Sequence, residues 1–123
     1  MSYGSGLMDV VQSSTTGTPT QFNDGSGTQI GTLCRAWVKF NGTAGTLTTS
    51  FNVSSITKNS TGNWLVNFTN AMPDANYSGS FCVNTASNIA NFYLPQTTNI
   101  QVLNYTTGGI PSDATICVLT IFR

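Results

Sequence analysis

The residues that could carry catalytic chemistry are few and widely spaced. The chain of 123 residues has no histidine and no glutamate, and its four acidic residues are Asp9, Asp24, Asp74 and Asp113. A Ser-His-Asp or Cys-His arrangement is therefore impossible, and carboxylates for glycoside cleavage are scarce. Asp74 and Asp113 could meet in space, but both lie in proline-containing turns, where an aspartate usually accepts hydrogen bonds from its own backbone. We therefore expect that the protein is not an enzyme.

The three cysteines, Cys34, Cys82 and Cys117, cannot all pair within one chain. They lack Cys-x-x-Cys spacing, and no histidine accompanies them, so we expect no metal site and no cofactor. Cys82 and Cys117 each lie between hydrophobic residues in strand-like segments. This setting favours buried free thiols with packing roles over a disulfide.

Charge is scarce in this chain and excludes several classes of partner. Charged residues make up 7% of the sequence, and four basic residues balance four acidic ones. Without a basic stripe, the chain lacks the electrostatic signature of nucleic-acid binding. It has no apolar run of membrane length, so we expect no membrane insertion. It also lacks the charged and apolar regions of a secretory signal.

Strand signals dominate the sequence and helix signals are nearly absent. Residues alternate at period two, with Ala36, Val38 and Phe40 set against Trp37 and Lys39. Trp64, Val66 and Phe68 alternate in the same way with Leu65, Asn67 and Thr69. Further strands are expected at Leu47–Val53, Ser80–Thr85, Asn91–Leu94, Ile100–Tyr105 and Ala114–Phe122. Clusters rich in Gly and Asn separate them at roughly 8–12 residues. The pattern predicts an all-β fold: a short N-terminal arm, residues 1–33, followed by an antiparallel β-sandwich or jelly-roll-like knob, residues 34–123.

The expected arm has a different composition from the knob. We divide it into a flexible Met1–Gly6, a short apolar strand Leu7–Gln12, a polar link Ser13–Thr20 and a hairpin Gln21–Gly31. The hairpin would turn at Asn23-Asp24-Gly25, between Phe22 and Ile30. Because an arm of this size cannot bury its own apolar residues, it should lie on another chain or on a host structure.

The last expected strand is apolar on both faces. Ile116, Val118 and Phe122 fall on one face, and Cys117, Leu119 and Ile121 fall on the other. A strand with two apolar faces is usually covered on both. We interpret Ile116, Val118, Leu119 and Ile121 as residues of a trimer interface, and the alternative is a central strand covered by a loop.

Two polar segments in the C-terminal half, Asn84–Asn91 and Tyr105–Asp113, are interpreted as loops. Neutral amides beside aromatic rings suit carbohydrate, whose C–H faces stack and whose hydroxyls need donors and acceptors. The candidate binding residues are Asn88, Asn91, Tyr93 and Tyr105. The alternative is an ordinary solvated loop with half-buried tyrosines. Trp37 and Trp64 are expected in the core or an interface.

The segment Cys34–Tyr77 resembles a module near the C-termini of tail fibres and other fibre-like virion proteins of tailed bacteriophages. The matching motifs occur in order at Cys34–Val38, Phe40–Thr43, Phe51–Ile56, Val66–Phe68 and Ala71–Tyr77. The preceding stretch Val10–Gly31 is similar to the lead-in of such fibres, and the resemblance covers little beyond Ser78.

This resemblance implies a viral structural protein on the exposed surface of a virion. It implies a small homotrimeric fibre or knob, held to another virion protein through residues 1–33, whose outward C-terminal half contacts carbohydrate or protein on the host cell. The alternative is a capsid decoration or head-fibre protein with an attachment or stabilising role. With no tag or trimmed end apparent, we expect a whole small gene product without a long fibre shaft.

Overall fold

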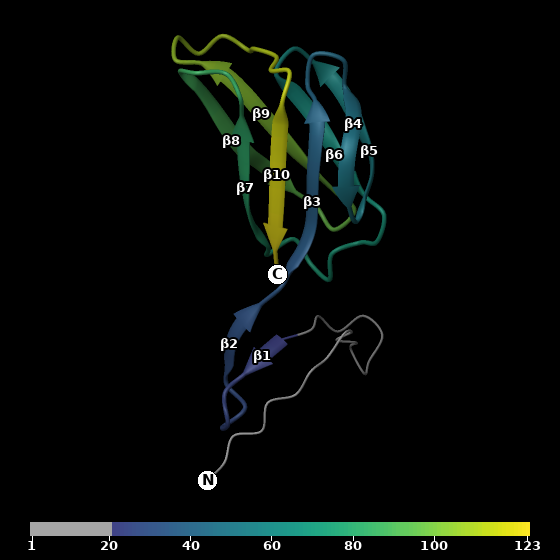
Figure 1. Ribbon diagram of the computed structural model, residues 1–123, viewed down its shortest axis with the longest axis vertical. Helices are drawn as coiled ribbons and strands as arrows, with labels where there is room; N and C mark the ends of the chain where they lie inside the picture. The colour runs from purple at the N-terminus through teal and green to yellow at the C-terminus, as the bar shows by residue number, and fades with distance from the viewer. Residues whose placement is uncertain (1–20) are drawn as a thin grey trace.

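The computed structural model describes residues 21–123 and shows an all-β fold, with two four-stranded sheets packed face to face and a separate hairpin (Figure 1). The strands are β1 (Gln21–Asn23), β2 (Gln29–Thr32), β3 (Cys34–Asn41), β4 (Thr46–Phe51), β5 (Val53–Ser60), β6 (Asn63–Phe68), β7 (Ser78–Val83), β8 (Asn88–Pro95), β9 (Asn99–Thr106) and β10 (Cys117–Phe122). The segments expected at 1–6, 7–12 and 13–20 lie outside the described residues.

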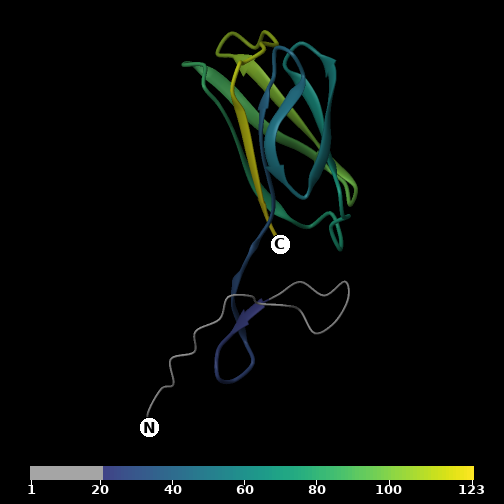
Figure 2. The same ribbon diagram turned by 45° about the vertical axis from the view of Figure 1, so that its right-hand side comes forward.

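Every strand pairing in the two large sheets is antiparallel. One sheet has the strand order β4-β3-β10-β7 and the other has the order β5-β6-β9-β8. Figure 2 shows the two sheets as layers. The chain crosses between them from β4 to β5, from β6 to β7, from β7 to β8 and from β9 to β10. The expected all-β sandwich is therefore confirmed.

Alternating apolar residues build the core between the layers. In β3 and β6 every second side chain is buried, as the sequence predicts: Ala36, Val38, Phe40, Trp64, Val66 and Phe68. The rings of Phe40, Trp64 and Phe81 gather at the centre, with centroids 5.7–6.3 Å apart. The Trp64 indole N–H donates to the carbonyl oxygen of Gly42 over 2.9 Å, so the largest core residue leaves no buried donor unpaired.

The expected strand Leu47–Val53 is extended as predicted but is not one strand, because the chain changes sheets within it. β4 ends at Phe51, Asn52 adopts a positive φ of 56°, and β5 begins at Val53 in the opposite sheet. The Asn52 side chain donates to the carbonyls of Arg35 and Asn70 and accepts from the Asn70 N–H. These bonds hold a conformation that few residues other than glycine and asparagine adopt.

The two ends of the sandwich differ. The hairpin β1–β2 and the C-terminus lie at the lower end in Figure 1. The turn 84–87 and the loop 107–116 lie at the upper end, which we call the distal end. Asn84 joins these two segments, because its amide donates to Thr115 Oγ1 over 3.0 Å and its Oδ1 accepts from the Ile116 N–H. The expected hairpin around Asp24 is present, with Phe22 opposite Gly31.

Candidate functional site

The outer side of the β5-β6-β9-β8 sheet, which we call the amide face, is neutral and carries both aromatic rings and amides. Residues opposite one another in antiparallel strands share a face, and successive residues alternate between faces. The outward rows are Tyr93–Gln101–Leu65, Asn91–Leu103–Asn63, Ile89–Tyr105 and Asn99–Asn67. None of these outward residues is charged, and 47% of the surface of Tyr93 is exposed.

Three of the four candidate binding residues lie on this face. Asn91 and Tyr93 point outward from β8, and Tyr105 points outward from β9. Asn88 does not join them, because it shares the inward side of β8 with Ala90 and Phe92, and its amide nitrogen is buried without a hydrogen-bond partner. Asn88 is therefore not part of the candidate binding surface, and its assignment as a binding residue is wrong.

The expected loop Asn84–Asn91 is also corrected. Only the turn 84–87 is irregular, and Asn88–Asn91 is the first half of β8. Tyr105, the first residue of the other expected loop, lies in β9 and forms an isolated bridge with Pro111. The candidate site is therefore a strand surface bordered by a distal loop.

Side-chain amides on the amide face hold one another in place. Asn63 Oδ1 accepts from the Gln101 amide over 2.9 Å and from the Asn59 amide over 3.4 Å. The Asn67 amide donates to Ser55 Oγ and Thr57 Oγ1 over 3.0 and 3.2 Å. Such bonds restrict rotamers before any ligand arrives, which lowers the entropy lost on binding. Each amide keeps further donor or acceptor capacity for a ligand.

Sequence reasoning missed Gln101, Leu103, Leu65 and Asn63 as members of this face. Part of the signal was present, because large apolar residues recur at every second position in Asn63–Phe68 and at Ile100 and Val102, and these positions are buried. What the sequence lacks is the pairing of β6 with β9, which lie far apart in the chain and become neighbours in the sheet.

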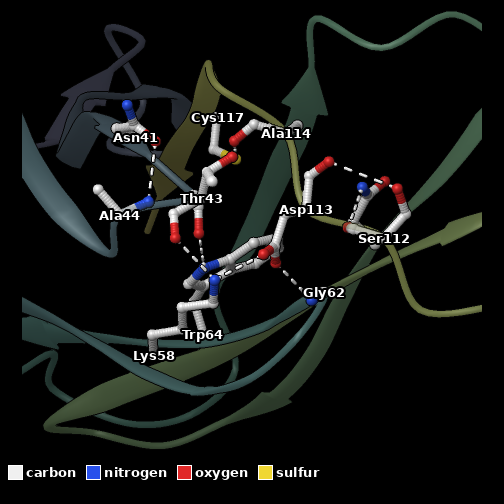
Figure 3. Close-up of polar contacts among 12 residues, drawn as sticks. Asn41, Thr43, Ala44, Lys58, Gly62, Trp64, Ser112, Asp113, Ala114 and Cys117 are labelled. Carbon is white, nitrogen blue, oxygen red and sulfur yellow. Dashed lines mark hydrogen bonds and ion pairs between the residues drawn. The ribbon is translucent and has the colours of Figure 1, made fainter.

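The two turn aspartates do not form a catalytic pair. Asp113 lies at the distal end, where it accepts from Lys58 over 2.5 Å and from the Gly62 N–H over 2.8 Å (Figure 3). Asp74 pairs instead with Arg123. Partial burial raises the pKa of Asp113, but the hydrogen bonds from Lys58 and Gly62 outweigh it and lower that pKa overall. The hydrogen bonds from Arg123 lower the pKa of Asp74. Both groups are ionised structural partners, with no raised pKa of the kind a general acid needs.

The expected trimer interface on β10 requires a correction. Leu119 and Ile121 face the sandwich core, with 1% and 0% of their surfaces exposed, because they pack between the two sheets. They cannot contact another chain in the folded protein. Ile116 and Val118 are exposed, at 39% and 38%. One face of β10 is therefore covered within the chain, and the other is open within the part of the chain that the structure describes.

The cysteines and tryptophans occupy different environments. Cys117 is buried, Cys34 is partly buried and Cys82 is exposed, and all three are free thiols. The expectation that Cys82 is buried is wrong, because it points outward from the edge strand β7. Trp64 is in the core, whereas 38% of the Trp37 surface is exposed on the outer side of β3.

Residues 21–123 contain no group of three or more acidic or cysteine side chains placed to bind a metal ion. The same part of the chain has no helix that could cross a membrane. In comparisons with known proteins, no family model, no curated protein and no solved structure matches this chain.

Proposed function

We propose that this protein is an exposed structural component of a tailed-phage virion, assembled as a small homotrimeric fibre or knob, whose amide face contacts carbohydrate on the host cell. The observation that carries the proposal is the composition of that face. Tyr93 and Tyr105 supply ring surfaces, and Asn91, Gln101 and Asn63 supply neutral donors and acceptors beside them.

Sugars need this combination because their C–H faces stack on aromatic rings while their hydroxyls exchange hydrogen bonds with water for hydrogen bonds with protein. A face without charge also predicts binding that changes little with ionic strength. The motifs of residues 34–77 support the virion role, because they resemble fibre modules of tailed phages.

The position of the amide face supports a host contact. The face extends along the length of the sandwich, and its Ile89–Tyr105 row adjoins the distal loops, away from the hairpin. If residues 1–33 attach the protein to the particle, the distal end points outward. The distal part of the amide face then already points toward the host cell, and the sandwich need not reorient to reach it.

Two experiments test this proposal. Immunogold labelling of virions with antibodies against the protein should label the tail, and labelling of capsid vertices would favour the decoration role. Virions carrying Tyr93→Ala, Gln101→Ala and Tyr105→Ala together should adsorb to host cells at least tenfold more slowly than the parent, since stacking contacts and hydrogen bonds contribute about 1 kcal/mol each.

The matched control is a triple variant in turns outside both outer faces, Thr43→Ala, Asn76→Ala and Thr97→Ala, which also removes three exposed side chains. It should adsorb normally. Equal adsorption by both triple variants and the parent, with normal incorporation into particles, would contradict the host-contact role.

A further inference from the structure

The outer side of the β4-β3-β10-β7 sheet, which we call the cationic face, is apolar and positively charged. Trp37 lies opposite Phe51 on β4, and Lys39 lies opposite Val118 on β10, so these side chains share one surface. Exposure reaches 55% for Phe51 and 42% for Phe122 on the same face. Single exposed apolar residues are normal, but a contiguous group of aromatic and aliphatic side chains marks an interaction surface.

The charges on this face lack partners within the described residues. The ion pairs of residues 21–123 are Lys58–Asp113 and Arg123–Asp74. Arg35 and Lys39, which project from β3 on the outward side, take part in neither. The cationic face of one copy cannot pack against the cationic face of another, because like charges would then lie close together across the contact.

The hairpin β1–β2 has the complementary chemistry. Its turn carries Asp24, which forms no ion pair among the described residues, and it exposes 48% of Phe22 and 69% of Ile30. The Asp24 carboxylate accepts from the backbone N–H groups of Ser26 and Thr28 at 2.9 and 2.8 Å, which fixes the turn with the anion at its end. An isolated two-stranded hairpin is marginally stable in water and gains stability by packing on another surface.

The hairpin does not pack on the sandwich of its own chain. It projects beyond the lower end of the sandwich (Figures 1 and 2), and Thr32 Oγ1 donates to the carbonyl oxygen of Arg123 at the junction. A hollow of about 670 Å³ opens beside this junction, lined in part by Leu33, Arg35 and Phe51. Arg35 and Phe51 belong also to the cationic face, so the hollow continues that face at its lower edge.

From these observations we infer that the hairpin β1–β2 of one copy docks on the cationic face of a second copy, with Asp24 beside Arg35 and Lys39 and with Phe22 or Ile30 against Trp37 and Phe51. The contact joins the hairpin of one chain to the sheet of the next, so it is heterologous and generates a closed ring when the rotation between copies permits. It concerns the purified protein alone and does not depend on the proposed function.

Zero-length crosslinking of a mixture of unlabelled and uniformly ¹⁵N-labelled full-length protein tests the inference directly. A carbodiimide joins a carboxylate to an amine only where the two are in contact. Mass spectrometry should find Asp24 joined to Lys39 in peptides of mixed isotopic mass. A crosslink found only within one chain, or its absence from an assembled sample, overturns the inference. If Lys39 is instead joined to Asp9, the cationic face binds a segment outside the described residues and not the hairpin. That result also overturns the inference.

Charge reversal supplies the second test. By sedimentation equilibrium, Lys39→Glu and Arg35→Glu should each raise the dissociation constant at least about tenfold, because each places a like charge beside Asp24 at the contact. Asp24 itself is kept, because its carboxylate also holds the hairpin turn. Unchanged assembly of both variants, or the unmodified protein remaining monomeric at all concentrations, overturns the inference.

Apolar contacts are tested with Trp37, whose emission should shift to shorter wavelength as assembly covers the ring, since Trp64 is already buried. Replacing Phe22 and Ile30 with Ser should abolish this shift, and the control Ile110→Ser, at a distal site that is 66% exposed, should leave it unchanged. Assembly that survives loss of Phe22 and Ile30 rules out the hairpin as the occupant. None of these results depends on host binding.

Discussion

The Lys58 ammonium group and the Asp113 carboxylate lie 2.5 Å apart and join the two sheets at the distal end. Lys58 belongs to β5, an edge strand of one sheet, and Asp113 precedes β10 of the other. The same ammonium donates to the Thr43 carbonyl in the turn between β3 and β4. Through one ion pair and one hydrogen bond, Lys58 therefore joins its own strand to two segments that are distant in the chain (Figure 3).

The replacement Asp113→Asn should lower the free energy of unfolding by about 1–2 kcal/mol, because the charge-assisted hydrogen bond to Lys58 is lost while the Gly62 N–H keeps an acceptor. Urea unfolding followed by tryptophan fluorescence measures the change. The control Asp74→Asn removes the exposed pair with Arg123 at the other end and should have a smaller effect, since exposed ion pairs contribute little. Equal effects of the two variants would contradict a special role for the distal pair.

Stability should also depend on pH through Asp113. Folding lowers the pKa of this carboxyl below its ordinary value of 3.8. Its contribution is therefore complete above pH 3.8 and is lost as the pH falls through the lower, folded-state pKa. The difference in unfolding free energy between the parent and Asp113→Asn should be constant near neutral pH and should narrow in this acidic range. A difference that instead widened on acidification would show that folding raises the pKa of Asp113.

Gly62 should tolerate no side chain. Its φ is +67°, and an added Cβ would lie 2.7 Å from the Ser112 nitrogen and still closer to the Asn104 carbonyl oxygen, both of them backbone atoms that cannot rotate away. Gly62→Ala should therefore destabilise the protein by about 2–4 kcal/mol. Gly108→Ala is the matched control, because Gly108 is at the same end and its added Cβ would meet only the Thr106 hydroxyl at 3.7 Å. Thermal unfolding of the two variants measures the difference.

The strand β10 shows which part of the fold can be predicted from the sequence and which part cannot. Its alternation separates Leu119 from Val118 correctly, but both faces are apolar, and the sequence cannot tell which one meets the opposite sheet. That choice depends on the pairing of β10 with β3 and β7, which sequence patterns do not encode. For the same reason, Asn91, Tyr93 and Tyr105 could be selected by residue type, whereas their shared surface with Gln101 and Asn63 required the register of β8, β9 and β6.

β5 shows a second limit. Only Val53 is fully buried in this strand and most of its other residues are exposed, so it has little of the apolar alternation that marks β3 or β6. A polar edge strand of this kind is held by backbone pairing with its neighbour, here β6. Its sequence is consequently hard to distinguish from that of a loop.

The two faces of β10 give a matched pair of substitutions. Leu119→Ala should destabilise the fold by about 2–5 kcal/mol, because it leaves a cavity between the sheets. Val118→Ala should cost less than about 1 kcal/mol in the isolated chain, since 38% of Val118 is already exposed. Urea unfolding at low protein concentration gives both values without interference from assembly. Similar costs for the two would show that β10 is covered on both faces within one chain.

Thiol reactivity distinguishes the cysteines in the native protein. Burial raises the pKa of Cys117 to about 12, so this thiol carries almost no thiolate at neutral pH and no reagent reaches it. Cys82 is exposed on the outer side of β7, opposite Val118.

In native protein a maleimide should therefore label Cys82 first and leave Cys117 unmodified. In unfolded, unreduced protein three thiols per chain should react. Peptide mapping identifies the labelled positions, and Cys82→Ser is the control that should remove the fast phase. One reactive thiol in the unfolded protein would reveal an intrachain disulfide, and rapid native labelling of Cys117 would mean that the distal end of the sandwich opens far more readily than its packing implies.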